Sequence, residues 1–407
     1  MQSVTVTFLS LIYLAGCGEG LVLISDVEVL KIRRRFRVFE SKIYANSCSQ
    51  GALSDVVEKA FENHLSTWHR EGSPWDLWVQ QYEEVRGAFA HLIGAHPDEV
   101  AIVPSASAAI NSVASALEFQ GRRKVVLGEF EFPTMGHVWL AQQRRGARVH
   151  FVSASADAIP VENYDREINR ETLIVPLTHV CFLNGFRSDV KTIVSLAHSR
   201  DALVMLDDYQ DCGTRPIDVK AVGVDFYVSG VLKYLLGPSG LAFLYVRREL
   251  ISSLVPTITG WLAQANPFAF DVKTIDLAPE ARRFETGTPP IPNVCAALAS
   301  LNLLNVIGMA GVAEQVKKTT QALLNGARRM DIRVKTPPDS VGPLVVLHAK
   351  DANAMLAKLA ERNIVASSRK DGVRIAFHVY NTLEDVGAIL DVFKENLDLL
   401  VRASVTT

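Results

Sequence analysis

Cysteine is scarce in this chain of 407 residues, and no two cysteines form a Cys-x-x-Cys pair; the five are Cys17, Cys48, Cys181, Cys212 and Cys295. An odd, scattered set excludes a disulfide-stabilised scaffold and a zinc-finger type of site, and it indicates the reduced thiols of a cytoplasmic protein. An excess of either charge is also missing, because 42 Lys and Arg stand against 44 Asp and Glu. Since surfaces that bind nucleic-acid phosphates usually carry a basic excess, we expect no nucleic-acid partner. We also expect no metal site.

Long apolar runs are rare as well, and the only candidate is Val4–Cys17 near the start of the chain. It is shorter than the roughly 20 apolar residues that span a bilayer. It ends in Leu14-Ala15-Gly16-Cys17, similar to a lipoprotein cleavage box, but no Lys or Arg precedes it as in a secretory signal. We therefore interpret residues 1–24 as a possible leader or a non-native extension. A cytoplasmic location without membrane contact is the main prediction, and an exported lipoprotein is the minor alternative.

What the sequence does contain is an alternation of strand-like and helix-like segments. The strand-like segments are 100–103, 124–127, 148–152, 173–176, 202–206 and 241–246, and helical spacing of apolar residues marks 78–93, 108–117 and 188–198. Short apolar strands that alternate with helices are typical of an α/β domain with a mostly parallel sheet flanked by helices. We expect this large domain to cover residues 25–288.

A change in composition near Pro289–Pro292 predicts the start of a smaller C-terminal α+β domain, residues 289–407. A long helix is expected from there to about Arg329. Short strands at 333–335, 344–348 and 373–377 follow, and a last amphipathic segment runs over 382–400. Thr382 and Asp385 have the spacing of a helix N-terminal capping pair. We expect the N-terminal segment of the large domain to contribute to this smaller one.

Groups that can carry chemistry gather in Ala202–Arg247. An apolar strand leads to Asp207 and Gln210, Asp225 closes a second hydrophobic stretch, and Lys233 precedes a Gly-Pro-Ser-Gly turn. Because sites in open α/β sheets lie at the carboxyl ends of the strands, these side chains can converge. A pyridoxal phosphate site needs such a lysine to hold the aldehyde and such an acid to keep the pyridine nitrogen protonated. A buried ion pair is the alternative.

The residue pattern of this segment resembles the cofactor-lysine region of the class V, fold-type I pyridoxal phosphate-dependent aminotransferases. The matching residues are Asp207, Gln210, Gly213–Val219 and Lys233-Tyr234-Leu235. Other segments match in the family's order, so that the resemblance covers roughly residues 40–395. It implies a fold-type I enzyme with pyridoxal 5'-phosphate on Lys233, where Lys233 and Asp207 are catalytic and Gln210 also binds the cofactor.

Two further segments resemble cofactor-binding parts of the family. Ser105-Ala106-Ser107 follows a strand and opens a helix, a place where free backbone N–H groups attract an anion, and the resemblance assigns Ala106 and Ser107 to the cofactor phosphate. Phe130–Thr134 is similar to the Phe-Pro-Thr segment of kynureninases. The resemblance puts the ring of Phe132 over the pyridine and Thr134 near the phosphate. Without it, an ordinary N-cap and a core phenylalanine would be the simpler interpretations.

Two segments are similar to parts that the partner subunit supplies in kynureninases. Thr259-Gly260-Trp261 resembles their Gly-Trp, and Glu285–Pro290 contains their Gly-Thr-Pro-Pro. The resemblance implies that Trp261 and Thr288 bind the phosphate across a homodimer interface. We therefore expect a homodimer with shared active sites.

The substrate group that the sequence indicates is a carboxylate. Gly372–Thr382 resembles the family's Val-Arg-Ile strand followed by Tyr-Asn-Thr, in which the arginine binds the substrate carboxylate. This role falls to Arg374, because a planar guanidinium holds a carboxylate with two parallel hydrogen bonds. Arg369 competes for the role, and a surface arginine is the alternative interpretation.

Departures from the family pattern narrow the chemistry. No cysteine lies between Val365 and Arg374, where desulfurases carry their reactive thiol, and Cys295 lies in an apolar run typical of packing. Leu232 stands where the family often has His or Tyr, and Gly230 stands where it often has Ser. Phe182 stands where many members have a polar residue near the cofactor. His179 is either a cofactor-side or a structural group.

We therefore predict an aminotransferase of the class V type that acts on an amino acid or small amine. A kynureninase-like hydrolase or a C–S lyase on the same scaffold is the alternative. A non-catalytic protein that keeps the fold is a further one, and the retained Lys233 and Asp207 argue against it.

Overall fold

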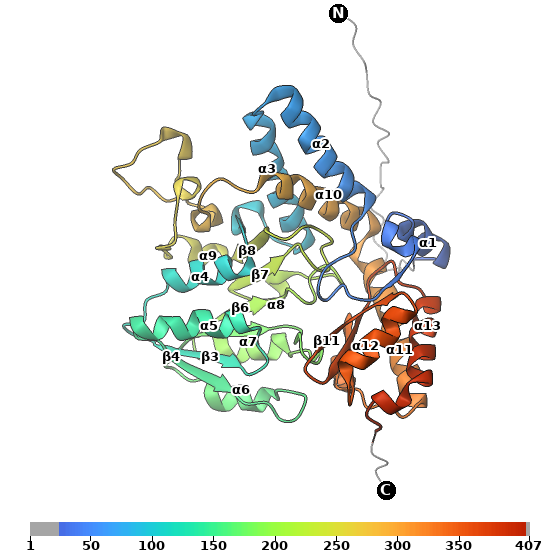
Figure 1. Ribbon diagram of the computed structural model, residues 1–407. Coiled ribbons are helices and arrows are strands. Elements are labelled where there is room, and N and C mark those ends of the chain that lie inside the picture. The colour runs from blue at the N-terminus through green and yellow to red at the C-terminus, as the bar shows by residue number, and fades with distance from the viewer. Residues whose placement is uncertain (1–23, 404–407) are drawn as a thin grey trace, which may run out of the picture.

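The computed structural model describes residues 24–403 (Figure 1). The expectations for the leader, the apolar run Val4–Cys17 and the lipoprotein-like box fall on residues 1–23, outside the described part. In the described part, a large α/β body with a central sheet lies beside a smaller C-terminal body, drawn in orange and red in Figure 1. The fold class predicted from the sequence is confirmed.

Seven strands form the central sheet. In spatial order they are β2 (Val100–Val103), β8 (Ala242–Val246), β7 (Phe226–Gly230), β6 (Leu203–Asp207), β5 (Thr172–Thr178), β3 (Lys124–Gly128) and β4 (Arg148–Val152). Strand β8 is antiparallel to both of its neighbours, β7 and β2, and the other pairs are parallel. Six strands therefore end at the same edge of the sheet, the edge at which ligands bind in such folds.

Helices cover both faces of this sheet, because all of its strands except the edge strand β4 are buried at almost every position. They are α2 (Asp55–Glu71), α3 (Trp75–Leu92), α4 (Ala106–Ala116), α5 (Pro133–Ala141), α6 (Val161–Glu167), α7 (Val190–His198), α8 (Val219–Val222), α9 (Arg248–Ile251) and α10 (Ile291–Ile307). Residues of α4 and α5 pack into one buried apolar cluster, and residues of α3, α7, α8 and α10 pack into another. The two clusters fix the sheet between two helical layers.

A third apolar cluster holds the C-terminal body together. Its elements are α11 (Met309–Arg329), β9 (Leu344–His348), α12 (Ala352–Glu361), β10 (Ile364–Val365), β11 (Ser367–Arg369), β12 (Gly372–Ala376) and α13 (Leu383–Glu395). Strands β11, β12 and β9 form an antiparallel sheet in that order. The capping pair predicted for the last helix is present, since the Asp385 N–H donates to the Thr382 hydroxyl at 3.3 Å.

The segment before residue 45 packs on the C-terminal body. Strand β1 (Ile43–Tyr44) pairs in parallel with β10, and Arg33 at the end of α1 (Asp26–Arg33) forms an ion pair with Asp385 at 2.7 Å. Helix α10, in turn, packs against α2 and α3 of the large body. The domain division near residue 289 stays a prediction, and the apolar core of the large body continues beyond that residue.

Three local expectations are wrong. The long helix expected up to Arg329 is two helices, α10 and α11, which meet at 80° at Gly308, whose φ of +82° is a left-handed conformation that glycine adopts without steric cost. Residues 333–335 form no strand; Val334 makes one isolated bridge to Leu347. Asp225 precedes β7 instead of closing a strand, so it lies at the sheet edge opposite to Asp207 and accepts a hydrogen bond from Val204 N–H at 2.6 Å.

No single helix in the stretch 24–403 is long and apolar enough to cross a membrane; α10 and α11 meet the length and composition limits only when taken together.

Candidate active site

A cavity of about 260 Å³ opens at the carboxyl ends of five parallel strands, β2, β3, β5, β6 and β7. Seven of the residues predicted for the cofactor site line it: Ala106, Ser107, Phe132, Thr134, Asp207, Gln210 and Lys233. They lie at the end of one of these strands or in the loop or helix that follows it. The parallel arrangement therefore brings together side chains that are up to 127 positions apart in the sequence, from Ala106 to Lys233.

Asp207 and Lys233 are the charged pair of this cavity. Asp207 is the last residue of β6; burial raises the pKa of its carboxyl, while the N–H of Tyr209, which donates to Oδ1 at 3.0 Å, and the charge of Lys233 lower it. Burial also lowers the pKa of Lys233 to about 8. Within residues 24–403, the Lys233 Nζ has no hydrogen bond and no ion pair within 4.0 Å. A half-buried amine that is easily deprotonated is suited to covalent chemistry.

Tyr209 is a cavity residue that the sequence reasoning missed. The Lys233 Nζ lies 4.4 Å from the centroid of its ring, and burial raises the pKa of its phenol to about 12. Its place depends on Gly230, because a Cβ atom at Gly230 would lie 2.3 Å from the Tyr209 ring. The departure from Ser at position 230 therefore makes room for an aromatic ring beside the lysine, and a tyrosine directly after the Asp-Asp pair was the available signal.

One wall of the cavity is aromatic. Phe132 is 46% exposed although it lines the cavity, and its ring packs edge-to-face on Phe182 with centroids 5.0 Å apart. The Lys233 Nζ lies 5.9 Å from the Phe132 centroid. An aromatic face left open beside a lysine offers a surface on which a flat ring can stack.

The start of α4 offers a place for an anion. Ser105 caps this helix by accepting the Ala108 N–H at 3.1 Å. The N–H groups of Ala106 and Ser107 precede the first intrahelical hydrogen bond, so they are free for a phosphate at the positive end of the helix. The Ser107 hydroxyl donates to the Thr134 hydroxyl at 3.3 Å, which places a second donor beside the same point.

Gln210 provides a direct sign that the cavity suits a polar ligand. Its Nε2 donates to the Cys48 carbonyl at 3.1 Å, whereas its Oε1 is buried and has no hydrogen-bond partner. Buried polar atoms are rarely left unpaired in native proteins. Together with the free helix N-terminus and the open Phe132 face, this atom indicates that the residues present fit pyridoxal phosphate.

Arg374 lies beside the cavity and not in its wall. It is 1% exposed, and it donates to the hydroxyls of Ser49 (2.8 Å) and Ser367 (2.9 and 3.1 Å) and to the carbonyl of Phe182 (3.1 Å). No carboxylate pairs with it within residues 24–403, and burial lowers its pKa. A buried guanidinium held only by neutral oxygens is costly unless an anion binds there.

Trp261 and Thr288 do not reach the cavity of their own chain. Trp261 stacks on Phe270 with centroids 6.3 Å apart, in a loop that extends away from the body (Figure 1, yellow). Thr288 is exposed, although the segment before it is fixed by Glu285, which is buried and accepts hydrogen bonds from Arg86 at 2.5 Å and from Tyr82 at 2.9 Å. In the single chain, therefore, neither Trp261 nor Thr288 is directed into the cavity.

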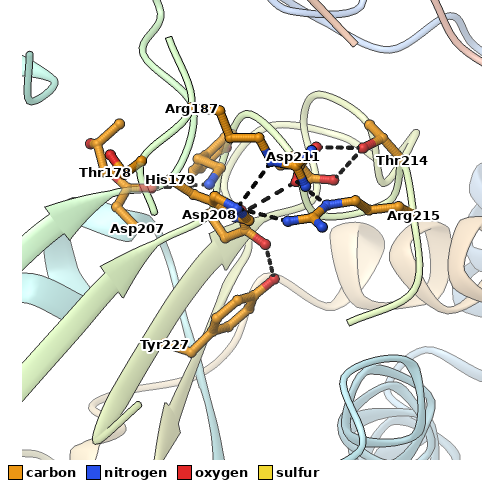
Figure 2. Close-up of polar contacts among 11 residues, drawn as sticks. Thr178, His179, Arg187, Asp207, Asp208, Asp211, Thr214, Arg215 and Tyr227 are labelled. Carbon is orange, nitrogen blue, oxygen red and sulfur yellow. Dashed lines mark hydrogen bonds and ion pairs between the residues drawn. The ribbon is translucent and has the colours of Figure 1, made fainter. Parts of the chain in front are cut away.

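Behind β6, on the side opposite to Asp207, lies a second polar cluster (Figure 2). Burial lowers the pKa of His179 to about 4, so its ring is neutral and donates from Nδ1 to Asp208 Oδ1 at 2.6 Å. The Tyr227 hydroxyl donates to the other Asp208 oxygen at 2.7 Å. His179, which the sequence left between two roles, therefore belongs to this cluster.

Arginines complete the cluster. Arg215 donates to His179 Nε2 at 2.7 Å and to Asp211 at 2.5 Å, and Arg187 forms an ion pair with Asp211 at 3.4 Å. The ligand atoms of His179, Asp208 and Asp211 lie within 4.8 Å of one another, a spacing that a metal ion could use. Two guanidinium groups already supply the positive charge, so the cluster is an internally satisfied network.

The thiols lie in different surroundings. Cys295, on α10, faces Gln81 and His64 and is remote from the cavity, whereas the Cys48 Sγ lies 3.9 Å from the Ser367 hydroxyl that holds Arg374. Strands β11 and β12 are joined by a tight turn at Lys370 and Asp371, without an inserted loop. All four cysteines in the described part of the chain are free.

Comparisons with known proteins agree with this geometry. The family model described as "Aminotransferase class-V" matches residues 45–389. An uncharacterized aminotransferase of Bacillus subtilis, YcbU, is 34% identical over 88% of this chain and 95% of that protein, and a kynureninase of Deinococcus radiodurans is 28% identical over 85% and 87%.

Among solved structures, the apo cysteine desulfurase from Thermococcus onnurineus NA1 superimposes with a TM-score of 0.82 at 21% identity, over 90% of this chain and 98% of that one. The cystine C–S lyase C-DES, in complex with cysteine persulfide, gives a TM-score of 0.81 at 21% identity, over 88% and 98%. At such identities these likenesses show the shared fold.

Proposed function

The chain belongs to the class-V aminotransferase family and is a pyridoxal phosphate-dependent enzyme, and we propose that it transfers the amino group of a small amino acid. The observation that carries the proposal is a pair of cationic side chains that form no ion pair within 4.0 Å with any acid of residues 24–403. Lys233 and Phe182 line the cavity. Arg374 lies beside it and donates to the carbonyl of Phe182. An amino acid can put its amine near Lys233 while its carboxylate binds Arg374.

The other residues of the cavity support this arrangement. When bound, pyridoxal phosphate supplies an electron-withdrawing ring that stabilises negative charge on the substrate carbon next to the amine. Asp207 would hold a proton on the ring nitrogen, and Ala106, Ser107 and Thr134 would bind the phosphate. Phe132 would stack on the ring, and Gln210 would bind one of its polar edges. Lys233 would hold the cofactor covalently and then carry a proton between substrate atoms.

The experiment that tests this function is a screen of half-reactions. The holoenzyme is mixed with single amino acids, the cofactor absorbance is followed, and released keto acid, ammonia and sulfide are measured. Transamination predicts one keto acid per active site and a cofactor left in its amine form. Continuous release of ammonia or sulfide without that change would contradict the proposal.

A kynureninase-like hydrolase or a C–S lyase is the second candidate, because a kynureninase is 28% identical and the segments around Phe132, Trp261 and Thr288 resemble those of kynureninases. The same screen separates the candidates by their products. Desulfurase chemistry is disfavoured, because the tight turn between β11 and β12 leaves no place for a loop with a reactive thiol.

We further propose that the functional unit is a homodimer with shared sites. The loop that carries Trp261 exposes several large apolar side chains: Phe268 (56%), Phe270 (72%), Val272 (94%) and Ile275 (73%). Clustered exposed apolar residues are typical of a protein interface. A second copy of the chain would cover them and would receive Trp261 and Thr288 at its phosphate site.

Complementation tests the shared site. A Lys233→Ala homodimer is expected to be inactive, and a Trp261→Ala, Thr288→Ala homodimer is expected to bind the cofactor weakly. Subunit exchange between the two gives heterodimers in which one site carries every change and the other carries none. Activity should then recover towards one intact site per heterodimer. No recovery, despite demonstrated exchange, would contradict sharing.

A cytoplasmic location is part of the proposal. The four described cysteines are free, and burial raises the thiol pKa of Cys181 and Cys295 to about 11. Reduced thiols suit a reducing compartment. Fractionation of cells that express the full chain tests this point, and recovery in a membrane or exported fraction would contradict it.

A further inference from the structure

The hairpin that supplies Arg374 carries a second arginine towards the same site. Strand β11 pairs with β12 so that Ser367 lies opposite Arg374 and Arg369 lies opposite Gly372. Alternate residues of a strand share a face. The Ser367 hydroxyl contacts Arg374, whereas Ser368 reaches Asn353 at 3.4 Å on the other face. Arg369 therefore shares the face of Ser367, about 7 Å further along the strand.

The side chain of Arg369 is uncommitted. It is exposed, and its guanidinium donates only to the neighbouring Ser368 carbonyl, at 2.7 Å; no carboxylate within residues 24–403 pairs with it. Its charge nevertheless reaches the active site, since it lowers the pKa of both Lys233 and Arg374. Arg369 thus adds positive charge to the mouth of the site.

The acid of the same hairpin is turned away from the site. Asp371 binds Lys335 at 2.5 Å and His348 at 2.8 Å, both outside the cavity. The ion pair with Lys335 engages the acid of the turn, so that this acid does not pair with Arg369. Burial raises the pKa of the Cys181 thiol, and the positive charge of the neighbouring Lys370 partly opposes this rise; Cys181 is next to Phe182 of the cavity wall. Beside the cavity the hairpin therefore presents cations only.

We propose that the substrate carries a second carboxylate on its side chain, and that Arg369 binds it while Arg374 holds the α-carboxylate. This inference rests on the proposed function and deepens it by naming the substrate class, an acidic amino acid. A neutral amino acid would leave Arg369 unpaired in water, whereas a dicarboxylic one gains a bidentate, charge-assisted pair. Arg369 is then a residue that determines specificity.

The test compares each acidic ligand with its neutral amide. Equilibrium titrations of the holoenzyme with succinate and with its monoamide, succinamate, are followed by the cofactor absorbance. Half-reactions with aspartate and glutamate are compared with those of asparagine and glutamine. We expect the acids to be favoured about 10- to 150-fold, as expected for a hydrogen-bonded charge pair. Arg369→Gln should abolish that preference and leave the amides within about twofold of the wild type.

Arg333→Gln is the matched control, because Arg333 is also exposed in the C-terminal body and its loss changes the net charge equally. It should keep the full preference. Equal binding of acid and amide by the wild type, or an equal loss with all ligands in Arg369→Gln, would overturn the inference alone, since transamination of neutral amino acids would continue. A holoenzyme that reacts with no amino acid would overturn the proposed function and this inference with it.

Discussion

Two polar regions flank strand β6, and they differ in how far their polar groups are already paired. Behind the strand, Asp208 accepts hydrogen bonds from His179 and Tyr227, and Asp211 is paired with arginines (Figure 2). In front of it, Lys233 forms no ion pair within 4.0 Å in the stretch 24–403, and Gln210 keeps a buried oxygen unpaired. Because folded proteins pair their buried polar groups, unpaired ones indicate a ligand and paired ones indicate structure.

The largest expected effect is that of Lys233→Ala, in the unpaired region. The variant removes the amine that we propose holds the cofactor and carries the proton, so turnover should fall by more than about 100- to 10,000-fold. Borohydride should fix the cofactor to Lys233 in the wild type, as detected by the mass of the peptide, and should fix nothing in the variant. A labelled peptide from another lysine would contradict the assignment.

The neighbouring acids, Asp207 and Asp208, give the sharpest comparison. Asp207→Asn should lower turnover by about 100-fold or more with little change in stability, because an amide cannot hold the ring proton. Asp208→Asn should keep most of the turnover but lower the free energy of unfolding by about 1–3 kcal/mol, because buried donors of His179 and Tyr227 lose a charged acceptor. Denaturant unfolding and steady-state kinetics measure both. The reverse pattern, in which Asp208→Asn loses turnover and Asp207→Asn loses stability, would mean that Asp208 and not Asp207 faces the cofactor.

A pair of arginines extends the comparison. Arg374→Lys keeps the charge and loses the planar fork, so the KM for the amino acid should rise about 10- to 150-fold. Arg215→Lys, the matched change behind β6, removes hydrogen bonds to His179 and Asp211 and should lower stability by about 1–3 kcal/mol while KM is kept. An unchanged KM in Arg374→Lys would leave Arg369 as the α-carboxylate ligand.

The smallest effect is a dependence of apoprotein stability on pH. The pKa of Lys233 falls from its ordinary 10.5 to about 8 in the folded chain. Between these two values the unfolded chain binds more protons than the folded one, so stability rises with pH across that window. Thermal unfolding of the apoprotein from pH 8 to 10 should therefore show a rising Tm relative to Lys233→Met. Parallel curves for the two proteins would mean that the amine titrates normally.

Parts of the fold and the site follow from short stretches of sequence. The strands at Val100–Val103 and Arg148–Val152 have the predicted bounds. The first is an apolar, fully buried run, and such a run between turn residues specifies a strand locally. Asp207 was predicted at the end of such a strand, and Lys233 at the same edge of the sheet, but the resemblance of the surrounding residues to the family was needed to favour a cofactor site over a buried ion pair. The family and the cofactor followed from the residues around them.

Residues whose role depends on distant partners were not predictable in this way. Tyr209 is a cavity residue only because Gly230 of a neighbouring strand leaves it space. The break between α10 and α11 depends on Gly308, and a single glycine in an apolar helical pattern is often tolerated. Asp225 looked like a strand end until the pairing of β7 placed it at the opposite edge.

The sequence by itself determined the fold class, the family and the cofactor, and it predicted Lys233 and Asp207 as the residues that hold the cofactor, because these depend on local patterns and on one topological rule. Only the tertiary structure decided which polar groups are already paired. Asp207 and Asp208 are adjacent and chemically identical, yet the alternation of β6 directs one into the cavity and the other into a saturated network. Partners brought from 29 and 19 positions away in the chain, His179 and Tyr227, determine that difference.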